Sequence, residues 1–467
     1  MISRQAAPIL GLLFLAGCVS GPDHVAPETV LPAKFSEGGS ASAGDVSLVA
    51  WWTAFNDKRL TGLVDQGISQ NLSVLQAMER ITSAQANVVS AGAGSLPSLT
   101  ASASESVSGS DGSGDFGTSS QDTRSTSAGG LNVSWLLDLF GQYRRAKESA
   151  NASLDAAYSS VDVAKLSFIS DLTTSYINAR YYQARIAIAR QNLKSRRETL
   201  DLTKLQLDAG AASRLDVVQS EGLVNSTLAD LPGFETNFRK SAHHIATLLG
   251  LPASTLIADL QKGAPQPVAR RSVKTGVPAD LIRNRPDIKV AERNLAAAVA
   301  EIGVAEAQLY PSITLSGSIS PSFISTSGAN GGVTSWSFGP SLSLPILDGG
   351  RLRANVTSSE SEARRLQLVW KQTVLDAVEE VENALAAYNR DSQTVNALRA
   401  TVQSYNEALE LSTASYKDGA SSLLDVLDAQ RSVSTAQASL AAAVQQMATD
   451  FVALNIAIGG GYDFDKR

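Results

Sequence analysis

The sequence predicts a mainly α-helical protomer that also contributes four strands to a membrane β-barrel. Three features support this fold class: an internal duplication, two long runs without glycine or proline, and four segments in which apolar and small polar residues alternate. The duplication and the long runs predict paired coiled-coil helices. The alternating segments predict strands with one apolar face.

The duplication is visible as two pairs of similar segments. Residues 96–100 resemble residues 310–314, and residues 210–217 resemble residues 419–426. Each half is therefore predicted to contain a helix, a strand, a loop, a strand, a long helix, a turn and a second helix. The two pairs differ slightly in their offset, and we assign this difference to a Ser/Gly-rich loop at residues 109–115.

Two runs, residues 142–209 and 351–418, contain no glycine or proline. As a continuous helix, each run would extend roughly 100 Å. Apolar residues recur every seven positions in both runs, which predicts left-handed supercoiling against neighbouring helices. The recurring residues are Leu172, Ala179, Ile186, Leu193, Leu200 and Leu207 in the first run, and Val381, Tyr388, Val395, Val402, Leu409 and Tyr416 in the second.

The alternating segments lie at residues 98–108, 131–137, 312–320 and 336–346. Strands of about ten residues with one apolar face are typical of transmembrane barrels, and Trp135 and Trp336 would suit an interfacial aromatic girdle. A soluble sheet packed on a core is the alternative. Barrels made by one chain need at least about eight strands, so the sequence predicts an oligomer. A dimer would supply eight strands and a trimer twelve, and a conducting tube favours the wider barrel.

The amino terminus has the pattern of a secretory signal: Arg4 precedes an apolar run at residues 9–15. Residues 15–18, Leu-Ala-Gly-Cys, resemble a bacterial lipobox. Cys18, the only cysteine in the chain, would then carry covalent N-acyl and S-diacylglycerol lipid after removal of residues 1–17. An ordinary signal peptide with an incidental cysteine is the alternative. Val19 in place of aspartate favours sorting to the outer membrane, by resemblance to known lipoproteins.

The composition argues against several classes of function. The chain has 39 basic and 45 acidic residues and a formal net charge of −6, which disfavours a nucleic-acid partner. No apolar run after the signal is long enough for a membrane-spanning helix. One cysteine and three histidines leave little for metal or general-base chemistry, and His243-His244 is predicted to be a plain surface pair. We expect no metal, no cofactor beyond the lipid, and no enzymatic activity.

Across the mature chain the sequence resembles the TolC-like outer membrane factors, in particular their RND/NodT-type lipoprotein branch. The resemblance rests on the duplication, on Gly21-Pro22-Asp23, on Trp51-Trp52, on LIRNRPDI at residues 281–288, and on LDVLDAQ at residues 424–430. It implies a homotrimer with a twelve-stranded barrel and an α-helical periplasmic tunnel. It also implies three partners: a periplasmic adaptor (membrane fusion) protein, an inner-membrane RND-type transporter, and outer membrane lipid.

The function implied is the outer membrane channel of a tripartite efflux pump, a passive export duct for drugs or other small molecules. A channel for type I protein secretion and a non-conducting acylated coiled-coil stalk are the alternatives. The expected domain order is a signal peptide (1–17), an acylated extended segment (18–56), a first repeat (57–270), a second repeat (271–458) and a C-terminal tail (459–467).

The candidate site lies at the two helix turns, Gly210 and Gly419, which should be farthest from the membrane. Ser213 and Ser422 each precede an acid by three positions, the spacing of a helix-capping box. Asp216 is thus predicted to cap its helix, and Tyr416 is predicted to pack in the seven-residue series.

The resemblance adds a second role for acidic residues near the turns. It implies that Asp425 and Asp428 form rings that narrow the periplasmic aperture, with Asp216 in the corresponding part of the first repeat. Carboxylates facing a common axis would attract cations. Four arginines beside the barrel, Arg144, Arg145, Arg351 and Arg353, are predicted to pair with lipid headgroups or with acids in the pore.

Overall fold

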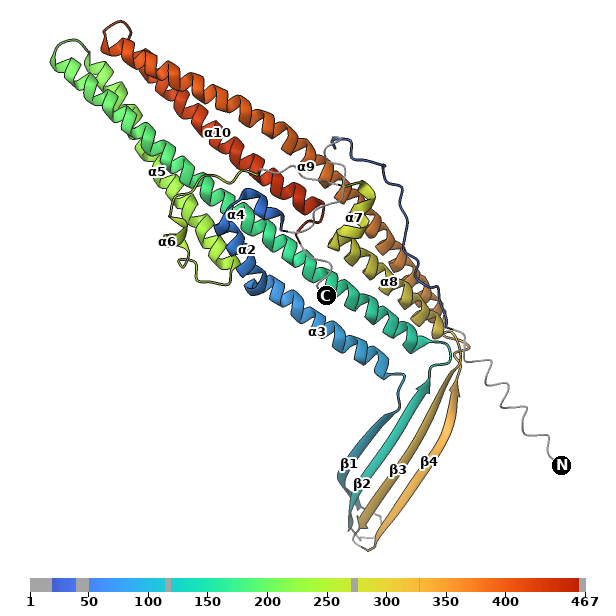
Figure 1. Ribbon diagram of the computed structural model, residues 1–467. Helices are drawn as coiled ribbons and strands as arrows, with labels where there is room; N and C mark the ends of the chain where they lie inside the picture. The colour runs from blue at the N-terminus through green and yellow to red at the C-terminus, as the bar shows by residue number, and fades with distance from the viewer. Residues whose placement is uncertain (1–18, 39–49, 114–118, 270–275, 327, 462–467) are drawn as a thin grey trace. The chain divides into compact units, whose positions relative to one another are not determined.

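The computed structural model describes residues 19–38, 50–113, 119–269, 276–326 and 328–461 (Figure 1). The first half contains η2 (Trp51–Phe55), α2 (Lys58–Gln70), α3 (Leu72–Ala93), β1 (Ser98–Ser113), β2 (Ser119–Leu137), α4 (Gln142–Asp208), α5 (Arg214–Leu248) and α6 (Ile257–Leu260). The second half contains α7 (Pro278–Asn284), α8 (Pro286–Ala307), β3 (Ser312–Thr326), β4 (Asn330–Ser343), α9 (Arg351–Lys417) and α10 (Leu423–Ala457). The predicted order of helices and strands is confirmed in both halves.

The two long helices are continuous, as predicted. α4 and α9 each contain 67 residues, and neither contains a residue that would interrupt helical hydrogen bonding. Leu172, Ala179, Val381 and Val395 of the seven-residue series are at most 1% exposed, and the other members are buried or half-buried. Among the residues described, no helix is both long and apolar enough to cross a bilayer.

The chain separates into two compact units, and each unit takes segments from both halves. Unit 1 comprises Met1–Glu28, Arg80–Ala157 and Val290–Trp370, and unit 2 comprises Thr29–Glu79, Tyr158–Lys289 and Lys371–Arg467. Unit 1 thus contains all four described strands, most of α8 and the first parts of α4 and α9. Unit 2 contains the returning helices α5 and α10 with the remaining parts of the long helices.

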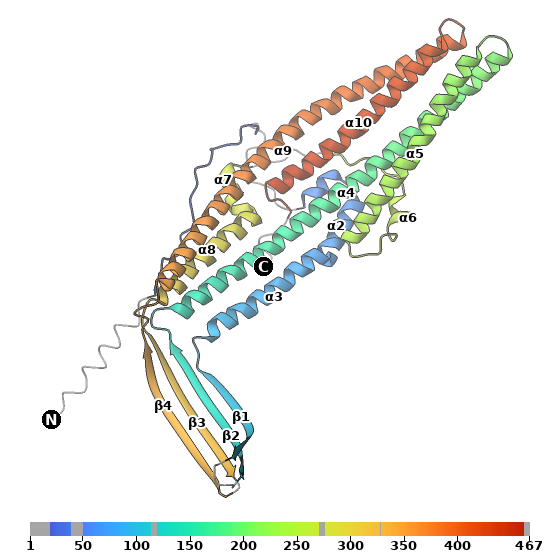
Figure 2. The same ribbon diagram turned by 180° about the vertical axis from the view of Figure 1, so that it is seen from behind.

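The strands of unit 1 form one antiparallel sheet in the order β1-β2-β3-β4 (Figure 2). Residues paired across the sheet share a face, because successive side chains of a strand point to opposite sides. One row consists of Ala101, Leu131, Ile319 and Trp336, and the row beside it on the other face consists of Thr100, Asn132, Ser318 and Ser337. The sheet therefore has an apolar face and a face of hydroxyl and amide groups, as the alternation predicts.

The strands are longer than predicted, and the first loop is shorter. β1 and β2 contain 16 and 19 residues, where about ten were expected from the apolar alternation. Residues 109–113, predicted as part of a loop, pair with residues 119–123 in the β1–β2 ladder. The prediction was wrong there because serine and glycine alone do not distinguish a loop from a strand, whereas the neighbouring strand supplies hydrogen-bond partners for the backbone.

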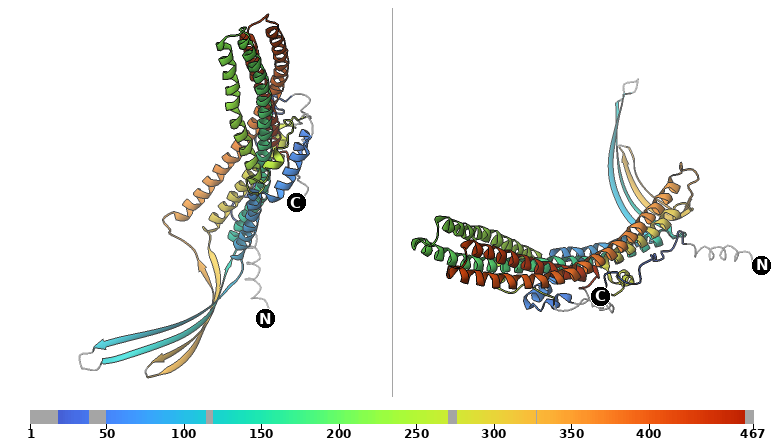
Figure 3. Two further views of the ribbon diagram at one scale, coloured as in Figure 1. Left: turned by 90° about the vertical axis from the view of Figure 1, so that its left-hand side faces the viewer. Right: turned by 90° about the horizontal axis from the view of Figure 1, so that it is seen from above.

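In unit 2 each long helix returns through a shorter one, α4 through α5 and α9 through α10 (Figure 3). Leu193 and Leu200 of α4 form an apolar cluster with Val217 and Val224 of α5. A second cluster around Tyr416 joins α9 to α10. These contacts bury the part of the seven-residue stripe that lies near the turns and pack each long helix against its returning helix.

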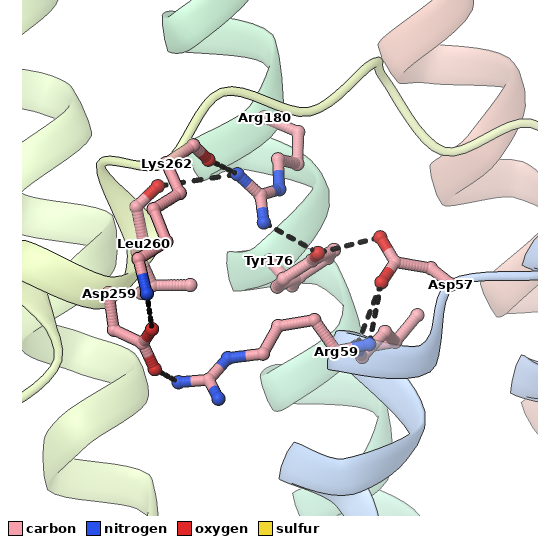
Figure 4. Close-up of polar contacts among 8 residues, drawn as sticks. Asp57, Arg59, Tyr176, Arg180, Asp259, Leu260 and Lys262 are labelled. Atoms are coloured by element: carbon pink, nitrogen blue, oxygen red, sulfur yellow. Dashed lines mark hydrogen bonds and ion pairs between the residues drawn. The ribbon is translucent and has the colours of Figure 1, made fainter.

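A polar network fixes α4 to α2 and to the chain after α6 in unit 2 (Figure 4). Asp57 accepts hydrogen bonds from the Arg59 N–H (2.8 Å) and from the Tyr176 hydroxyl (2.6 Å). Arg180 donates to the Tyr176 oxygen (2.9 Å) and to the Lys262 carbonyl (2.9 Å). Burial, followed by the bond to Asp57, raises the pKa of Tyr176 above its ordinary value, so this hydroxyl stays neutral and holds the network together.

Candidate functional site

The hairpin turns of unit 2 are closed by glycines in the left-handed conformation. Gly210 has φ +77° and Gly419 has φ +72°, a region that L-residues with a Cβ adopt only at a cost. Ala211 and Ala420 donate backbone hydrogen bonds to Gln206 and Ser415, five positions back (2.7 and 2.8 Å), as in common helix C-terminal motifs. The turns are tight because these bonds satisfy the last carbonyls of α4 and α9.

Each returning helix begins with a serine and an acid that bind one another. Asp216 accepts from the backbone N–H and from the hydroxyl of Ser213 (both 2.8 Å), and the Ser213 hydroxyl accepts from the Asp216 N–H (3.2 Å). Asp425 accepts from the N–H and hydroxyl of Ser422 (3.1 and 2.9 Å). Both carboxylates therefore accept hydrogen bonds from the backbone N–H groups of the N-cap serines, and they lie at helix N-termini, where negative charge is favourable.

The acids predicted for the aperture are accessible to solvent. Asp425 and Asp428 are exposed, and Asp216 is half-buried. Asp428 forms an ion pair with Arg431 of the next turn (2.8 Å). The structure thus places a capping acid and a paired acid on the first turns of α10. Their role in an aperture stays a prediction.

Tyr416 packs as predicted, and its hydroxyl makes a contact that the sequence did not indicate. Its side chain is 8% exposed and contacts Leu423, Val426 and Leu427. The hydroxyl donates a hydrogen bond to the side-chain oxygen of Gln206 on α4. This bond links the α9–α10 hairpin to the α4–α5 hairpin close to both turns. The signal available in the sequence was a tyrosine in a stripe whose members are mostly aliphatic.

A second polar connection between the hairpins lies farther from the turns. Gln430 of α10 is 4% exposed and donates to the hydroxyl of Thr199 on α4 (2.8 Å). Nearby, Arg196 of α4 donates to the hydroxyl of Thr227 on α5, and burial lowers the pKa of its guanidinium. Buried polar residues of this kind fix the register of packed helices.

The other predicted residues lie elsewhere in the two units. In α5, His243 is half-buried and His244 is exposed, and no cluster of potential metal ligands is found among the described residues. Trp336 is 78% exposed on the apolar face of the sheet, and the Trp135 indole donates to the Ser95 carbonyl (2.9 Å). Cys18 lies outside the described residues.

Arg145 is 4% exposed, so the prediction that it pairs with lipid headgroups was wrong. It forms ion pairs with two acids, Asp23 and Glu148 (both 2.8 Å), and donates to the carbonyl groups of Ser20 and Gly21. That these acids belong to a pore stays a prediction. Sequence patterns could not reveal the contacts with residues 20–23, which lie more than a hundred positions away. Arg351 and Arg353 are exposed, and their partners stay a prediction.

Comparison with known proteins agrees with this arrangement. The sequence profile described as "Outer membrane efflux protein" matches residues 63–251 and 277–460. Nodulation protein T of Rhizobium leguminosarum bv. viciae is 61% identical over 463 residues, which cover 99% of this chain and 94% of the relative. Outer membrane protein OprJ of Pseudomonas aeruginosa is 32% identical, covering 97% of this chain and 95% of the relative. The solved outer-membrane channel OprN has a TM-score of 0.84 at 32% identity, covering 95% of this chain and 99% of that channel.

The chain belongs to the outer membrane efflux protein family. It is an efflux channel protein of the outer membrane, as the sequence resemblance indicated, and the predicted fold class is confirmed.

Proposed function

We propose that this chain forms, as a homotrimer, the outer membrane duct of a tripartite efflux pump and catalyses no reaction. The duct would receive drugs or other small molecules from an inner-membrane RND-type transporter through a periplasmic adaptor protein. The observation that supports this most directly is the four-stranded sheet, which is apolar on one face, hydroxyl-rich on the other, and bounded by β1 and β4. Sheet edges do not remain unpaired in a bilayer, so neighbouring protomers would complete the ladder.

The number of strands supports a trimer over a dimer. The described part of each protomer supplies four strands, and a barrel of about eight strands leaves room only for side chains or one small ligand. A homotrimer would give a wider barrel whose hydroxyl-rich face lines the lumen and whose apolar face contacts lipid.

The entrance would be restricted at the hairpin turns by acidic residues. Asp425 and Asp428 are exposed on the first turns of α10, and Asp216 occupies the corresponding position of α5. Repeated around a common axis, these carboxylates would attract cations. The duct would open when the adaptor binds better to a state in which the hairpin turns have moved apart.

The chain would also be anchored by lipid. Cys18 follows a lipobox-like sequence, and acyl chains contribute about 0.8 kcal/mol of membrane affinity for each buried CH₂ group. Several chains on one residue would therefore hold the amino terminus in the outer membrane without another cofactor.

Single-channel recording in planar bilayers tests this proposal. The wild type should give small, cation-selective currents. Asp425→Asn/Asp428→Asn should give larger currents with lower cation selectivity, since asparagine still accepts the capping hydrogen bonds but has no charge. Glu407→Gln, which removes an exposed carboxylate of α9, is the matched control and should conduct like the wild type. Folded, inserted protein that passes no current would overturn the duct, and unchanged currents in the double variant would overturn the acidic aperture.

A further inference from the structure

The segment that follows the lipobox-like sequence is held by a buried arginine of unit 1. Arg145 of α4 donates to the carbonyl oxygens of Ser20 and Gly21 (both 2.9 Å) and to the Asp23 carboxylate (2.8 Å). It also forms an ion pair with Glu148 (2.8 Å). A buried guanidinium is stable only when its donors are used, and the planar arrangement of its donors allows it to bind several acceptors at once.

Three glycines allow the same segment to lie directly against the helices. A Cβ atom on Gly21, which has φ +84°, would stand 2.4 Å from the Cα of Gly303 in α8. A Cβ on Gly303 would stand 2.6 Å from the Ser20 carbonyl oxygen, and one on Gly141 would stand 2.8 Å from the Val19 side chain. At Gly21 and Gly303 a larger residue would have to displace backbone, whereas at Gly141, which has φ +81°, it would displace the Val19 side chain and adopt a strained backbone conformation.

Two further contacts complete the attachment. The Ser20 N–H donates to the Phe140 carbonyl in the connection between β2 and α4 (3.0 Å). The His24 imidazole hydrogen-bonds to Glu292 of α8 (2.5 Å). We call Gly141, Arg145, Glu292 and Gly303 the N-terminal clasp. The clasp fixes residues 19–24 at the place where the sheet gives way to helix.

Almost no free chain separates Cys18 from the residues that the clasp holds. Only Val19 separates Cys18 from Ser20, the first residue with a backbone hydrogen bond to the β2–α4 connection. Two residues of extended chain reach at most about 7 Å. A lipid on Cys18 would therefore enter the bilayer beside the end of β2, with no flexible linker.

We propose that the N-terminal clasp fixes the position of the lipid anchor relative to the strands of unit 1. The anchor would then set the depth at which these strands enter the membrane leaflet that holds the acyl chains. A flexible tether would only need to keep the protein near the membrane, and it would need neither a buried arginine nor close glycine contacts. The inference rests on the lipidation proposed above and adds that the lipid on Cys18 has a fixed position relative to the strands of unit 1.

Two variants separate docking of the segment from the depth of the anchor. Arg145→Met removes the donors that hold residues 20–23, and Lys147→Met, at an exposed cation of the same helix, is its control. Insertion of a Gly-Ser linker between Val19 and Ser20 keeps the Arg145 contacts but adds slack between them and Cys18. Each protein is purified from outer membranes, where the amount of heat-modifiable oligomer and the intact mass of the mature chain are measured. A nitroxide on Val25→Cys, an exposed position, reports whether the segment is immobilised.

We expect wild-type acylated mass in every variant. Arg145→Met should release the nitroxide and lower oligomer yield several-fold, and the linker variant should lower the yield while the nitroxide stays immobilised. A linker variant that assembles like the wild type would overturn the depth role alone. An immobilised nitroxide in Arg145→Met would overturn the clasp, and a wild-type mass without lipid would overturn the lipidation while leaving the channel proposal intact.

Discussion

At the scale of single residues, unit 2 contains a buried acid beside a second acid. Asp450 of α10 is 6% exposed, accepts a hydrogen bond from Gln446 (2.9 Å), and lies next to Asp391 of α9. Burial, together with the contact to Asp391, raises the pKa of Asp450 to about 6. A carboxyl in this position is held more easily as the neutral acid than as the anion.

This pKa predicts a stability that depends on pH. In the unfolded chain the Asp450 carboxyl loses its proton above the ordinary pKa of 3.8, whereas in the folded state it keeps the proton up to about pH 6. The free energy of unfolding therefore falls as the pH rises from about 3.8 to about 6, and it stays reduced at higher pH. Asp450→Asn removes the charge and should stabilise the protein by about 1–3 kcal/mol near pH 7.5 but by much less near pH 4. Thermal dissociation of the purified oligomer at both pH values measures this difference. An equal gain at both values would contradict the assignment.

The Tyr416 hydroxyl is a second residue whose effect can be isolated. Tyr416→Phe keeps the packing with Leu423 and Val426 but removes the hydrogen bond to Gln206. We expect the free energy of unfolding to fall by about 1 kcal/mol. The mean single-channel conductance should rise, because the two hairpins lose a connection near their turns. Tyr405→Phe, at an exposed tyrosine of the same helix, should change neither the stability nor the current.

At the scale of elements, the turns and caps fix where each hairpin reverses. Gly419 has φ +72° and no atom near the position of a Cβ, so a substitution there meets conformational strain but no collision. Gly419→Ala should therefore destabilise the protein by roughly 1–2 kcal/mol. Gly222→Ala within α5 also meets open space, but at helical φ it should stabilise by up to about 1 kcal/mol. Chemical denaturation of both variants tests whether the opposite signs are found.

The helices could be predicted better than the strands, for a physical reason. A run without glycine or proline and with a seven-residue stripe specifies a long helix through local propensity and one buried face. The outer parts of β1 and β2 have no such local signal. Residues 109–113 are strand because residues 119–123 pair with them, which is a property of two segments together.

The same limit applies to the candidate site. Ser213 with Asp216 and Ser422 with Asp425 could be predicted because a capping box spans only four residues. Arg145 could not, since its partners at residues 20–23 are distant in sequence. Nor could the bond from Tyr416 to Gln206, which depends on how two hairpins pack. Hydrogen bonds between residues close in sequence could be predicted, whereas contacts between distant segments could be identified only from the structure.

At the scale of the whole molecule, the two faces of the sheet make the proposed barrel testable with one pair of adjacent residues. Leu131 and Asn132 are neighbours in β2, both exposed, and their side chains point to opposite faces. Leu131 lies in the row of Ala101, Ile319 and Trp336 on the apolar face. Asn132 lies on the face of hydroxyl and amide groups.

Arginine at these two positions should therefore have different effects. A cation facing lipid costs about 2–4 kcal/mol at the midplane of a bilayer and about 0–1 kcal/mol near the interface, so Leu131→Arg should reduce the yield of inserted oligomer, and the size of the loss reports how deep this row lies. Asn132→Arg should assemble normally, because a lumen holds water, and should lower cation conductance by electrostatic repulsion. Outer membrane yield and single-channel current measure the two effects on the same preparations. If Asn132→Arg fails to insert while Leu131→Arg conducts with altered selectivity, the lumen lies on the apolar side of the sheet, and the proposed barrel is wrong.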